Sequence, residues 1–214
     1  MTKKIGIIGS GQVAQILASG FLKHGYQVAI GTSDVSKLAD WKKKNASAHV
    51  GSFESAAKFG DKIVLAVKGT SSEALVKSLS SSLAGKIVID TTNPIALAPP
   101  TAGVLQYFTS LGDSLMERLQ KLAPEAKFVK AFNSVGNLFM VNPAFPGGKP
   151  TMFICGNDKK AKKEVSKILD QFGWETADFG HAESARAIEP LCILWCLPGM
   201  LNNEWQHAFK LLKM

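Results

Sequence analysis

The sequence lacks the features that mark several large classes of protein. It holds three cysteines among 214 residues, too few and odd in number for a disulfide framework, as is typical of a reducing compartment. Its longest late apolar stretch, residues 191–201, contains Pro198 and Gly199 and is too short to span a bilayer. The first residues form no signal peptide, because their apolar run is short and interrupted by glycine. We therefore expect a cytoplasmic protein with no membrane partner.

Positive charge is in excess, but no nucleic-acid reader accompanies it. There are 25 Lys and Arg residues against 17 Asp and Glu, a net charge of +8, and two lysine clusters lie within 42–44 and 159–163. We expect both on solvated helix faces, and a basic surface also attracts polyanionic cofactors. Because no reader motif or interleaved aromatic pattern is present, we predict no nucleic-acid partner.

Motifs of hydrolytic and metal-dependent catalysis are missing as well. The sequence contains no H-E-x-x-H, Walker A or G-x-S-x-G pattern, and no Cys/His cluster with metal-ligand spacing. Cys192 and Cys196 stand four residues apart in an expected helix, where core packing is favoured over metal binding. We therefore predict neither a metal site nor a catalytic side chain of these classes.

One motif organises the chain: a short apolar run that ends in a glycine turn. Gly9, Gly11 and Ala14 have the spacing G-x-G-x-x-A, directly after the run 5–8 and at the start of an apolar-periodic helix. The first glycine permits a tight turn, the second lets a diphosphate approach the backbone, and the alanine lets helix and strand pack closely. The helix N-terminus offers free N–H groups and a positive dipole to phosphates. The motif predicts a dinucleotide site; a turn that binds nothing is the alternative.

The remaining pattern predicts an α/β fold. Continuous apolar runs such as 63–67 and 87–89 are typical of strands buried on both faces, and they alternate with helical patterns. We expect Thr70 and Glu73 to form a capping box at the start of one helix. The long loop 91–112 is expected to be functional. We predict one unit over residues 1–214, a Rossmann-type doubly wound, mostly parallel sheet with a helical C-terminal extension over about 183–214.

The end of the second predicted strand, 27–31, bears on the choice of nucleotide. An NAD site usually has a carboxylate there that accepts from the ribose 2′-hydroxyl. Here the strand is followed by Thr32 and Ser33, and Asp34 comes slightly late. Small hydroxyls with the nearby Lys37 suit a 2′-phosphate better, so we favour NADP over NAD. The alternative is that these residues only cap the following helix.

At this point the chain resembles a known family. The runs 5–14, 28–32, 63–67 and 87–94, and above all Phe-Val-Lys-Ala-Phe-Asn-Ser-Val-Gly at 128–136, look like the deazaflavin (coenzyme F420)-dependent NADP oxidoreductases. Segments 153–158 and 184–191 fit as well. The cytoplasmic reductase domain of the STEAP metalloreductases is similar over much of the same span. The resemblance implies hydride exchange between NADPH and a flavin-like ring, in which proximity and orientation rather than a catalytic side chain do the work.

The resemblance also implies a role for individual residues. The cofactor-binding residues would be Gly9, Ser10, Gly11, Gln12 and Val13 at the diphosphate, Thr32, Ser33 and Lys37 at the 2′-phosphate, Ala66, Val67 and Lys68 beyond the fourth strand, and Asn93 and Pro94 at the nicotinamide. The acceptor would face Asn133, Ser134, Val135 and Gly136, walled in by 184–201. Lys68 stands where the family commonly has proline, and Asn133 where it can have histidine.

Several alternatives stay open at this point. The acceptor could be coenzyme F420, FMN or FAD. A reductase of imines or small carbonyl compounds, of the pyrroline-carboxylate or hydroxyacid dehydrogenase type, is a second interpretation, and a non-catalytic NADP-binding or sensing module is a third. Lys130 could protonate a product or form a structural ion pair. The apolar residues of 191–197 could form a homodimer contact or cover the core.

Overall fold

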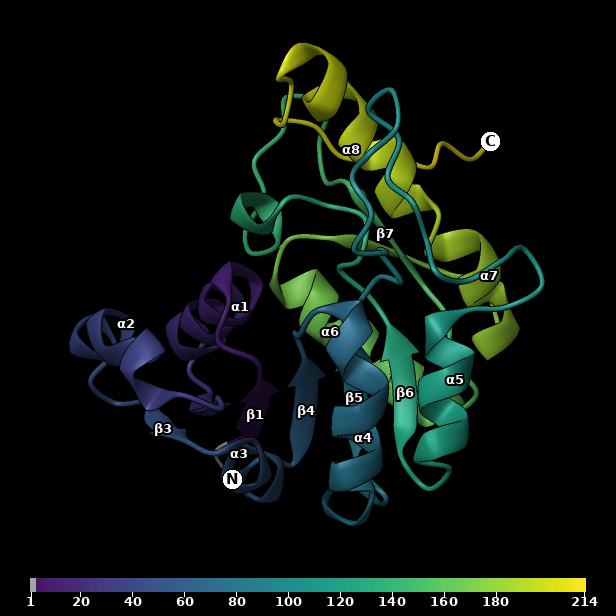
Figure 1. Ribbon diagram of the computed structural model, residues 1–214. Coiled ribbons are helices and arrows are strands. Elements are labelled where there is room, and N and C mark those ends of the chain that lie inside the picture. The colour runs from purple at the N-terminus through teal and green to yellow at the C-terminus, as the bar shows by residue number, and fades with distance from the viewer. Residues whose placement is uncertain (1–2) are drawn as a thin grey trace.

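The computed structural model describes residues 3–214, and a six-stranded parallel sheet lies at its centre. The strand order is β3-β2-β1-β4-β5-β6, which confirms the predicted Rossmann-type fold (Figure 1). The strands are β1 Lys4–Ile8, β2 Gln27–Gly31, β3 His49–Gly51, β4 Lys62–Leu65, β5 Ile87–Asp90 and β6 Lys127–Lys130. The arrows of β1, β4 and β6 point toward the lobe at the top of Figure 1, and all six strands pair in parallel, so the carboxyl ends of the strands meet at one edge.

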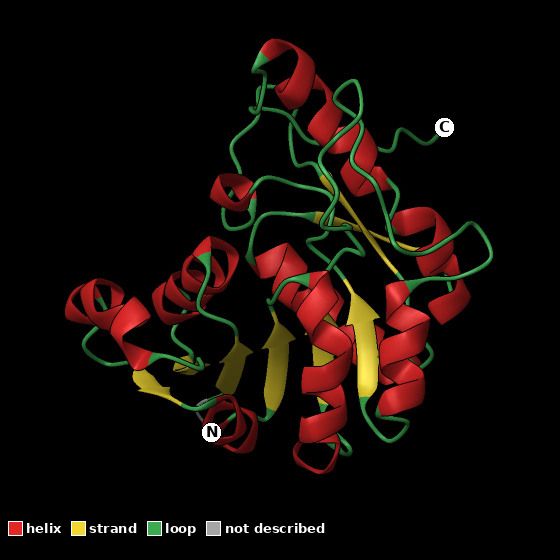
Figure 2. Ribbon diagram, in the orientation of Figure 1, coloured by secondary structure: helices red, strands yellow, loops and turns green. Residues whose placement is uncertain are grey.

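Helices cover both faces of this sheet (Figure 2). They are α1 Gln12–Lys23, η1 Val35–Leu38, α2 Ala39–Lys44, α3 Phe53–Phe59, α4 Gly69–Leu83, α5 Leu115–Leu122 and α6 Lys159–Gln171. Neighbouring strand residues point to opposite faces, so Ile7 packs with α1 and α6 whereas Ile8 packs with α3, α4 and α5. Both clusters are fully buried, which accounts for the continuous apolar runs in the sequence.

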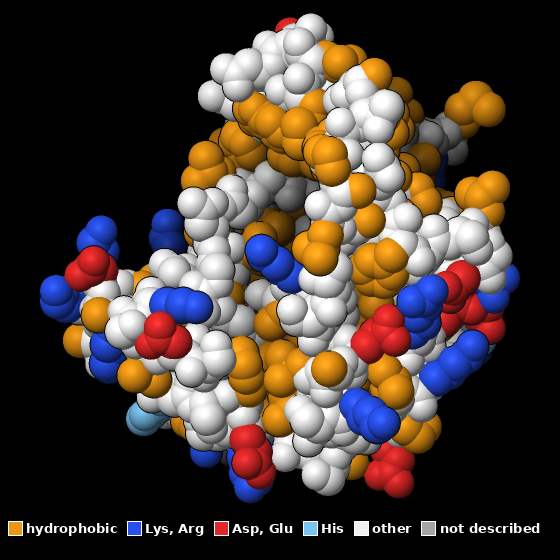
Figure 3. All heavy atoms as spheres, in the orientation of Figure 1, with side chains coloured by type: hydrophobic (Ala, Val, Ile, Leu, Met, Phe, Trp, Pro, Cys, Tyr) orange, Lys and Arg blue, Asp and Glu red, His pale blue; other side chains and the backbone are white. Residues whose placement is uncertain are grey.

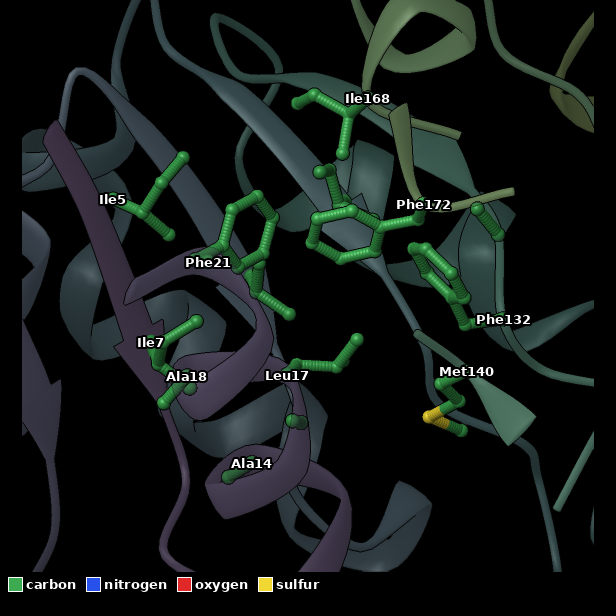
Figure 4. Packing of buried hydrophobic residues seen from close by; sticks show 14 of the residues in the cluster. Ile5, Ile7, Ala14, Leu17, Ala18, Phe21, Phe132, Met140, Ile168 and Phe172 are labelled. Carbon is green, nitrogen blue, oxygen red and sulfur yellow. The ribbon is translucent and has the colours of Figure 1, made fainter. Parts of the chain in front are cut away.

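Aromatic rings join α1 to α6 on the first of these faces (Figure 4). Phe21 of α1 faces Phe172 at a ring distance of 4.9 Å, and Phe132, just after β6, lies 6.2 Å from Phe172. All three side chains are buried. Such pairs add to the burial of apolar area, so this cluster fixes the end of β6 against the first helix.

A second, two-stranded parallel sheet lies beyond β6. It consists of β7 Thr151–Ile154 and β8 Glu175–Asp178, and Lys130 N–H donates to the Cys155 carbonyl where β6 meets it. Lys162 of α6 is buried, and its ammonium group donates to Asp178 Oδ1 and to the Gly180 carbonyl, both at 2.8 Å. The expectation that the whole cluster 159–163 is solvated is therefore wrong for this lysine.

The C-terminal segment is helical only in part. After η2 Asn137–Phe139 and η3 Ala182–Ser184 come α7 Ala185–Ile188 and α8 Leu191–Asn202, whereas residues 203–214 have no helix. This last stretch runs beside β7, where Thr151 N–H donates to the Phe209 carbonyl at 2.8 Å. The expected helical extension to residue 214 thus ends at Asn202. No helix within residues 3–214 is both long and apolar enough to cross a bilayer.

Candidate functional site

The glycine turn lies between β1 and α1, and each small residue has a distinct environment. Gly9 has a φ of +135°, and a Cβ there would overlap with the Ala66 carbonyl oxygen. A Cβ at Gly11 would meet nothing within 4 Å, so the space beside its backbone is open. Ala14 is fully buried against the strand. Gly9 is therefore required by packing, whereas Gly11 leaves room for a ligand.

The N-terminus of α1 keeps its hydrogen-bonding capacity for a ligand. Its N-cap is Gly11, which supplies no side-chain cap, and the first turn holds no acidic residue. The Ser10 carbonyl is bound by Gln15 Nε2 at 2.8 Å, and Ser10 Oγ accepts from Thr32 Oγ1 at 3.0 Å. Free N–H groups, a positive dipole end and an ordered serine are what a diphosphate requires. The residues present therefore fit the predicted nucleotide.

Residues 32–37, at the end of β2, were expected either to bind a 2′-phosphate or to cap the following helix, and in the structure different residues are available for each role. The Asp34 carboxylate accepts from the N–H of Ser36 at 3.0 Å and from its hydroxyl at 2.6 Å, and these bonds lower the pKa of Asp34. Asp34 thus caps η1, as the capping alternative expects, and is occupied by its own helix turn. Ser33 and Lys37 are exposed, and neither side chain has a hydrogen bond or ion pair within the described residues. They remain free for a phosphate.

Residues 66–68 connect the glycine turn to α4. Ala66 N–H donates to the Ile8 carbonyl at 2.8 Å, which places the end of β4 beside the turn. Helix α4 begins at Gly69 with Lys68 as its N-cap, and no side chain caps it. The predicted capping box is therefore wrong, and Glu73 instead pairs with Arg118 of α5 at 3.2 Å. Lys68 is exposed at this helix start.

Two asparagine side chains bind each other across the ends of β5 and β6. Asn93 Nδ2 donates to the Asn133 carbonyl at 2.8 Å, and Asn133 Nδ2 donates to Asn93 Oδ1 at 3.2 Å and to the Ile188 carbonyl at 3.0 Å. Asn133 Oδ1 is buried and has no hydrogen-bond partner among the described residues. Phe132, directly before it, has a φ of +63°, a strained value for an aromatic residue. The strained backbone at Phe132 and the unused Asn133 Oδ1 both mark the end of β6 as a candidate binding position.

The segment that follows Asn133 closes the site on one side. Ser134 and Val135 are buried, and a Cβ at Gly136 would lie 2.9 Å from the ring of Trp195 in α8. Asn137 Nδ2 donates to Gln12 Oε1 at 3.1 Å, which joins this segment to the start of α1. The structure thus links the predicted residues around the carboxyl ends of β1, β2, β4, β5 and β6, where open α/β sheets bind their ligands.

Sequence reasoning missed the partners of Lys130. Its ammonium group is completely buried and lies 2.6 Å from Asp90 Oδ2 and 2.8 Å from Glu189 Oε1. Burial alone would lower the pKa of Lys130, but the two carboxylates outweigh it and raise the pKa above the ordinary value. Lys130 therefore forms the structural ion pair, which was one of the two roles expected for it. Asp90, at the end of an apolar strand, was the only signal of this pairing in the sequence.

The chain is similar to known oxidoreductases over much of its length. Residues 4–94 match the family described as NADP oxidoreductase coenzyme F420-dependent. The chain is 29% identical to the metalloreductase STEAP3 of Rattus norvegicus over 202 residues, which are 92% of this chain and 39% of that protein. It is 32% identical to the F420-dependent NADP reductase of Methanocaldococcus jannaschii over 137 residues, which are 64% of this chain and 60% of that protein. The chain thus spans less than two thirds of each of these relatives.

Solved structures extend the likeness over the whole chain. A candidate F420-dependent NADP-reductase from Arthrobacter sp. FB24 superposes with a TM-score of 0.92 at 29% identity, covering 100% of both chains. A pyrroline-5-carboxylate reductase from Coxiella burnetii reaches 0.65 at 18% identity, covering 90% of this chain and 64% of that one, and shares the fold alone. Fold and matches together show a Rossmann-type fold that resembles the folds of NADP oxidoreductases. Residues 4–94 are similar to the coenzyme F420-dependent family, and the likeness to one candidate member extends over the whole chain.

Proposed function

We propose that the protein transfers a hydride between NADPH and a deazaflavin of the coenzyme F420 type. One observation carries the proposal: the open diphosphate turn at Gly11 and the Asn93–Asn133 pair lie along one sheet edge, joined by the Gln12–Asn137 bond. When bound, NADPH supplies the hydride, and the deazaflavin takes it up with one proton. The protein's task is then to bind and align two rings, and the uncharged segments 91–112 and 131–148, which carry the Asn93–Asn133 pair, suit that task.

The nucleotide would lie from the end of β2 to the end of β5. Residues Gly9–Val13 would hold the diphosphate, residues Ala66–Lys68 would line its path, and Asn93 with Pro94 would flank the nicotinamide. Thr32, Ser33 and Lys37 would hold the 2′-phosphate. Two features support NADP over NAD: the Asp34 carboxylate is engaged by Ser36, and a hydroxyl and a cation stand exposed beside it.

Replacing Ser33 by arginine is expected to tighten NADPH binding by about tenfold and to leave NADH within about twofold. An exposed guanidinium at this place can bind a 2′-phosphate in bidentate fashion, and NADH has no such group. The measurement is a pair of titrations followed by protein fluorescence. Ser47→Arg, on an exposed turn, adds the same charge elsewhere and serves as the control. Equal tightening of both nucleotides would show that Ser33 does not face the 2′-phosphate.

The acceptor would lie against Asn133, Ser134, Val135 and Gly136, under Trp195. The segments around it, 91–112, 131–148 and 190–203, contain no charged residue, although the chain as a whole is strongly basic. In Figure 3, hydrophobic side chains gather on the upper lobe of this face, where little charge is visible apart from an acidic side chain at its top edge, whereas Lys, Arg, Asp and Glu gather over the helices below. Such a wall suits a flat, neutral ring. The compared families name F420 and give no support to FMN or FAD.

Lys68 is the exposed cation at the start of α4, and we expect it to contact an anionic group of the nucleotide or of the acceptor. Lys68→Glu should weaken that binding about tenfold at low ionic strength, with less effect at high salt. Lys77→Glu, on the exposed face of the same helix, changes the net charge equally and is the control. If both variants lose the same affinity, long-range attraction rather than a contact explains the effect. The affinities would be measured at two salt concentrations.

Two alternatives differ in what they require. An imine or small-carbonyl reductase shares the fold, but its support is limited to structures below 25% identity. A sensing module would need the nucleotide site without turnover. The deciding experiment is to mix the protein with NADPH and oxidised F420 and to follow the absorbance of both. Loss of both absorbances at equal rates would support the proposal, whereas NADPH binding without any transfer to F420, flavins or imines would favour the sensing module.

A further inference from the structure

A buried hydrogen-bonded ring lies directly behind the proposed site. Lys130 Nζ donates to the Thr92 carbonyl at 2.9 Å in addition to forming its two ion pairs. Asp90 Oδ1 accepts from the N–H of Thr92 at 2.9 Å and from its hydroxyl at 2.7 Å. Thr92 is therefore held from both sides, its N–H and hydroxyl by Asp90 and its carbonyl by Lys130.

The same contacts lead on to the asparagine pair. Asn93 follows Thr92 and exchanges hydrogen bonds with Asn133, whose Nδ2 also binds the Ile188 carbonyl. Glu189 follows Ile188 and returns to Lys130 at 2.8 Å. These contacts form a closed ring, because Lys130 in turn pairs with Asp90. The ring runs through Asp90, Thr92, Asn93, Asn133, Ile188, Glu189 and Lys130. It couples the ends of β5 and β6 to α7.

Glu189 also binds the C-terminal part of the long loop 91–112 and the start of the helix that follows it. Its carboxylate accepts from the N–H groups of Leu115 and Met116 at 3.0 Å each, at the start of α5. The hydroxyl of Tyr107 donates to the Glu189 carbonyl at 2.8 Å. A carboxylate at a helix N-terminus is stabilised by the dipole as well as by these bonds. The ring is therefore anchored to elements on each side of it.

An apolar core of the same volume would be about as stable as this ring, because buried ion pairs rarely exceed their desolvation cost. Hydrogen bonds and ion pairs, unlike apolar contacts, require particular orientations of the groups that form them, so they fix where these side chains and the adjoining backbone lie. We propose that Lys130, Asp90 and Glu189 are positioning residues for hydride transfer, which hold the Asn93–Asn133 pair where the two rings are to be aligned. This inference rests on the proposed function. Transfer requires the reacting carbons to approach to about 3–3.5 Å, and a misplacement of about 1 Å can cost about 100-fold in rate.

Two adjacent threonines provide a matched test. Thr92 and Thr91 are both buried, and each binds one acceptor through both its N–H and its hydroxyl. The acceptor of Thr92 is Asp90 Oδ1 in the ring, whereas that of Thr91 is the Leu65 carbonyl outside it, at 3.2 and 2.9 Å. Thr92→Val and Thr91→Val therefore each remove one hydroxyl bond and leave the N–H bond in place.

We expect the two variants to lose similar melting temperature but to differ in function. Thr92→Val should lower kcat for transfer from NADPH to F420 at least tenfold with KM within about twofold, and Thr91→Val should leave both unchanged. A readout independent of activity is the side-chain amide resonances of Asn93 and Asn133, assigned by changing each to aspartate. These should shift or broaden in Thr92→Val only.

Equal kcat values and equal amide spectra in the two variants would overturn the positioning role. If the wild type binds NADPH but transfers no hydride to any acceptor, the proposed function fails, and the amide resonances still decide whether the ring holds the pair. If the amides shift in Thr92→Val while kcat is unchanged, the ring holds the pair but does not position the reaction, and the inference is wrong.

Discussion

Replacing Lys130 by methionine is expected to lower the free energy of unfolding by about 3–5 kcal/mol. The side chains have similar length, so the loss does not come from a cavity. It comes from Asp90 and Glu189, which would remain buried without a cation. Denaturant unfolding monitored by tryptophan fluorescence measures the effect, with the slope of the transition checked for two-state behaviour.

Lys162→Met is the matched control, because Lys162 is also buried and also binds a carboxylate and a carbonyl. The side chain of its partner Asp178 is 47% exposed, so that carboxylate regains water when the lysine is removed. We expect a loss of about 1 kcal/mol there. Equal losses at the two positions would show that the unpaired carboxylates do not determine the cost.

The pH dependence follows from the raised pKa of Lys130. A lysine whose folded pKa lies above its unfolded value contributes stability that is complete below the unfolded value and is lost as the pH rises through the folded one. The wild-type ring is therefore fully formed at neutral pH and weakens only in strong alkali. In Lys130→Met, protonation of an unpaired carboxylate should relieve the defect, so its deficit should shrink as the pH is lowered.

Local patterns predicted most of the fold. The alternation of apolar strands and helices gave the parallel sheet, because each strand buries both faces and each helix one stripe. The glycine turn was recognisable because the G-x-G-x-x-A spacing is local and the φ of +135° at Gly9 is a local backbone conformation that favours glycine. The same holds for Asp158, the N-cap of α6, whose carboxylate accepts from Ala161 N–H at 2.8 Å.

Two identical patterns show where local reasoning fails. Thr70 and Ser114 each precede a glutamate by three residues. Ser114 does cap its helix: its hydroxyl accepts from the N–H of Glu117 at 3.2 Å and donates to the Glu117 carboxylate at 2.7 Å. At Thr70 the helix begins at Gly69, two residues earlier than a Thr70 cap would place it, and Glu73 binds Arg118, which is 45 residues away in the chain. Glu117 also binds a distant arginine, Arg186, so the two stretches differ in where the helix begins, which the spacing alone does not predict.

The buried ring lay beyond sequence reasoning for the same reason. Lys130 and Glu189 are separated by 59 residues, and their side chains meet only after β6 and α7 have packed. A lysine at a strand end gives no sign of whether it will be solvated or enclosed. The sequence does not predict the strained φ of Phe132 either, because an aromatic residue is not expected in the left-handed region.

Gly11→Val is expected to weaken NADPH binding at least about 100-fold while leaving the fold intact. The φ and ψ of Gly11 are −73° and −178°, an extended conformation that valine adopts readily, and its Cβ would meet nothing within 4 Å. The isopropyl group would instead occupy the space through which a diphosphate approaches the α1 N-terminus. Titration with NADPH and thermal melting without ligand measure the two effects separately.

Two further glycines make this prediction specific. Gly112→Val also places a side chain in open space, but far along the 91–112 loop, and should leave both affinity and melting temperature unchanged. Gly9→Val should unfold or strongly destabilise the protein, because of its φ of +135° and the overlap with Ala66. If Gly11→Val binds NADPH as tightly as the wild type, the open space beside Gly11 does not hold the diphosphate, and the nucleotide must bind elsewhere. If it instead melts like Gly9→Val, the two glycines serve packing alike, and the division of roles within the turn is wrong.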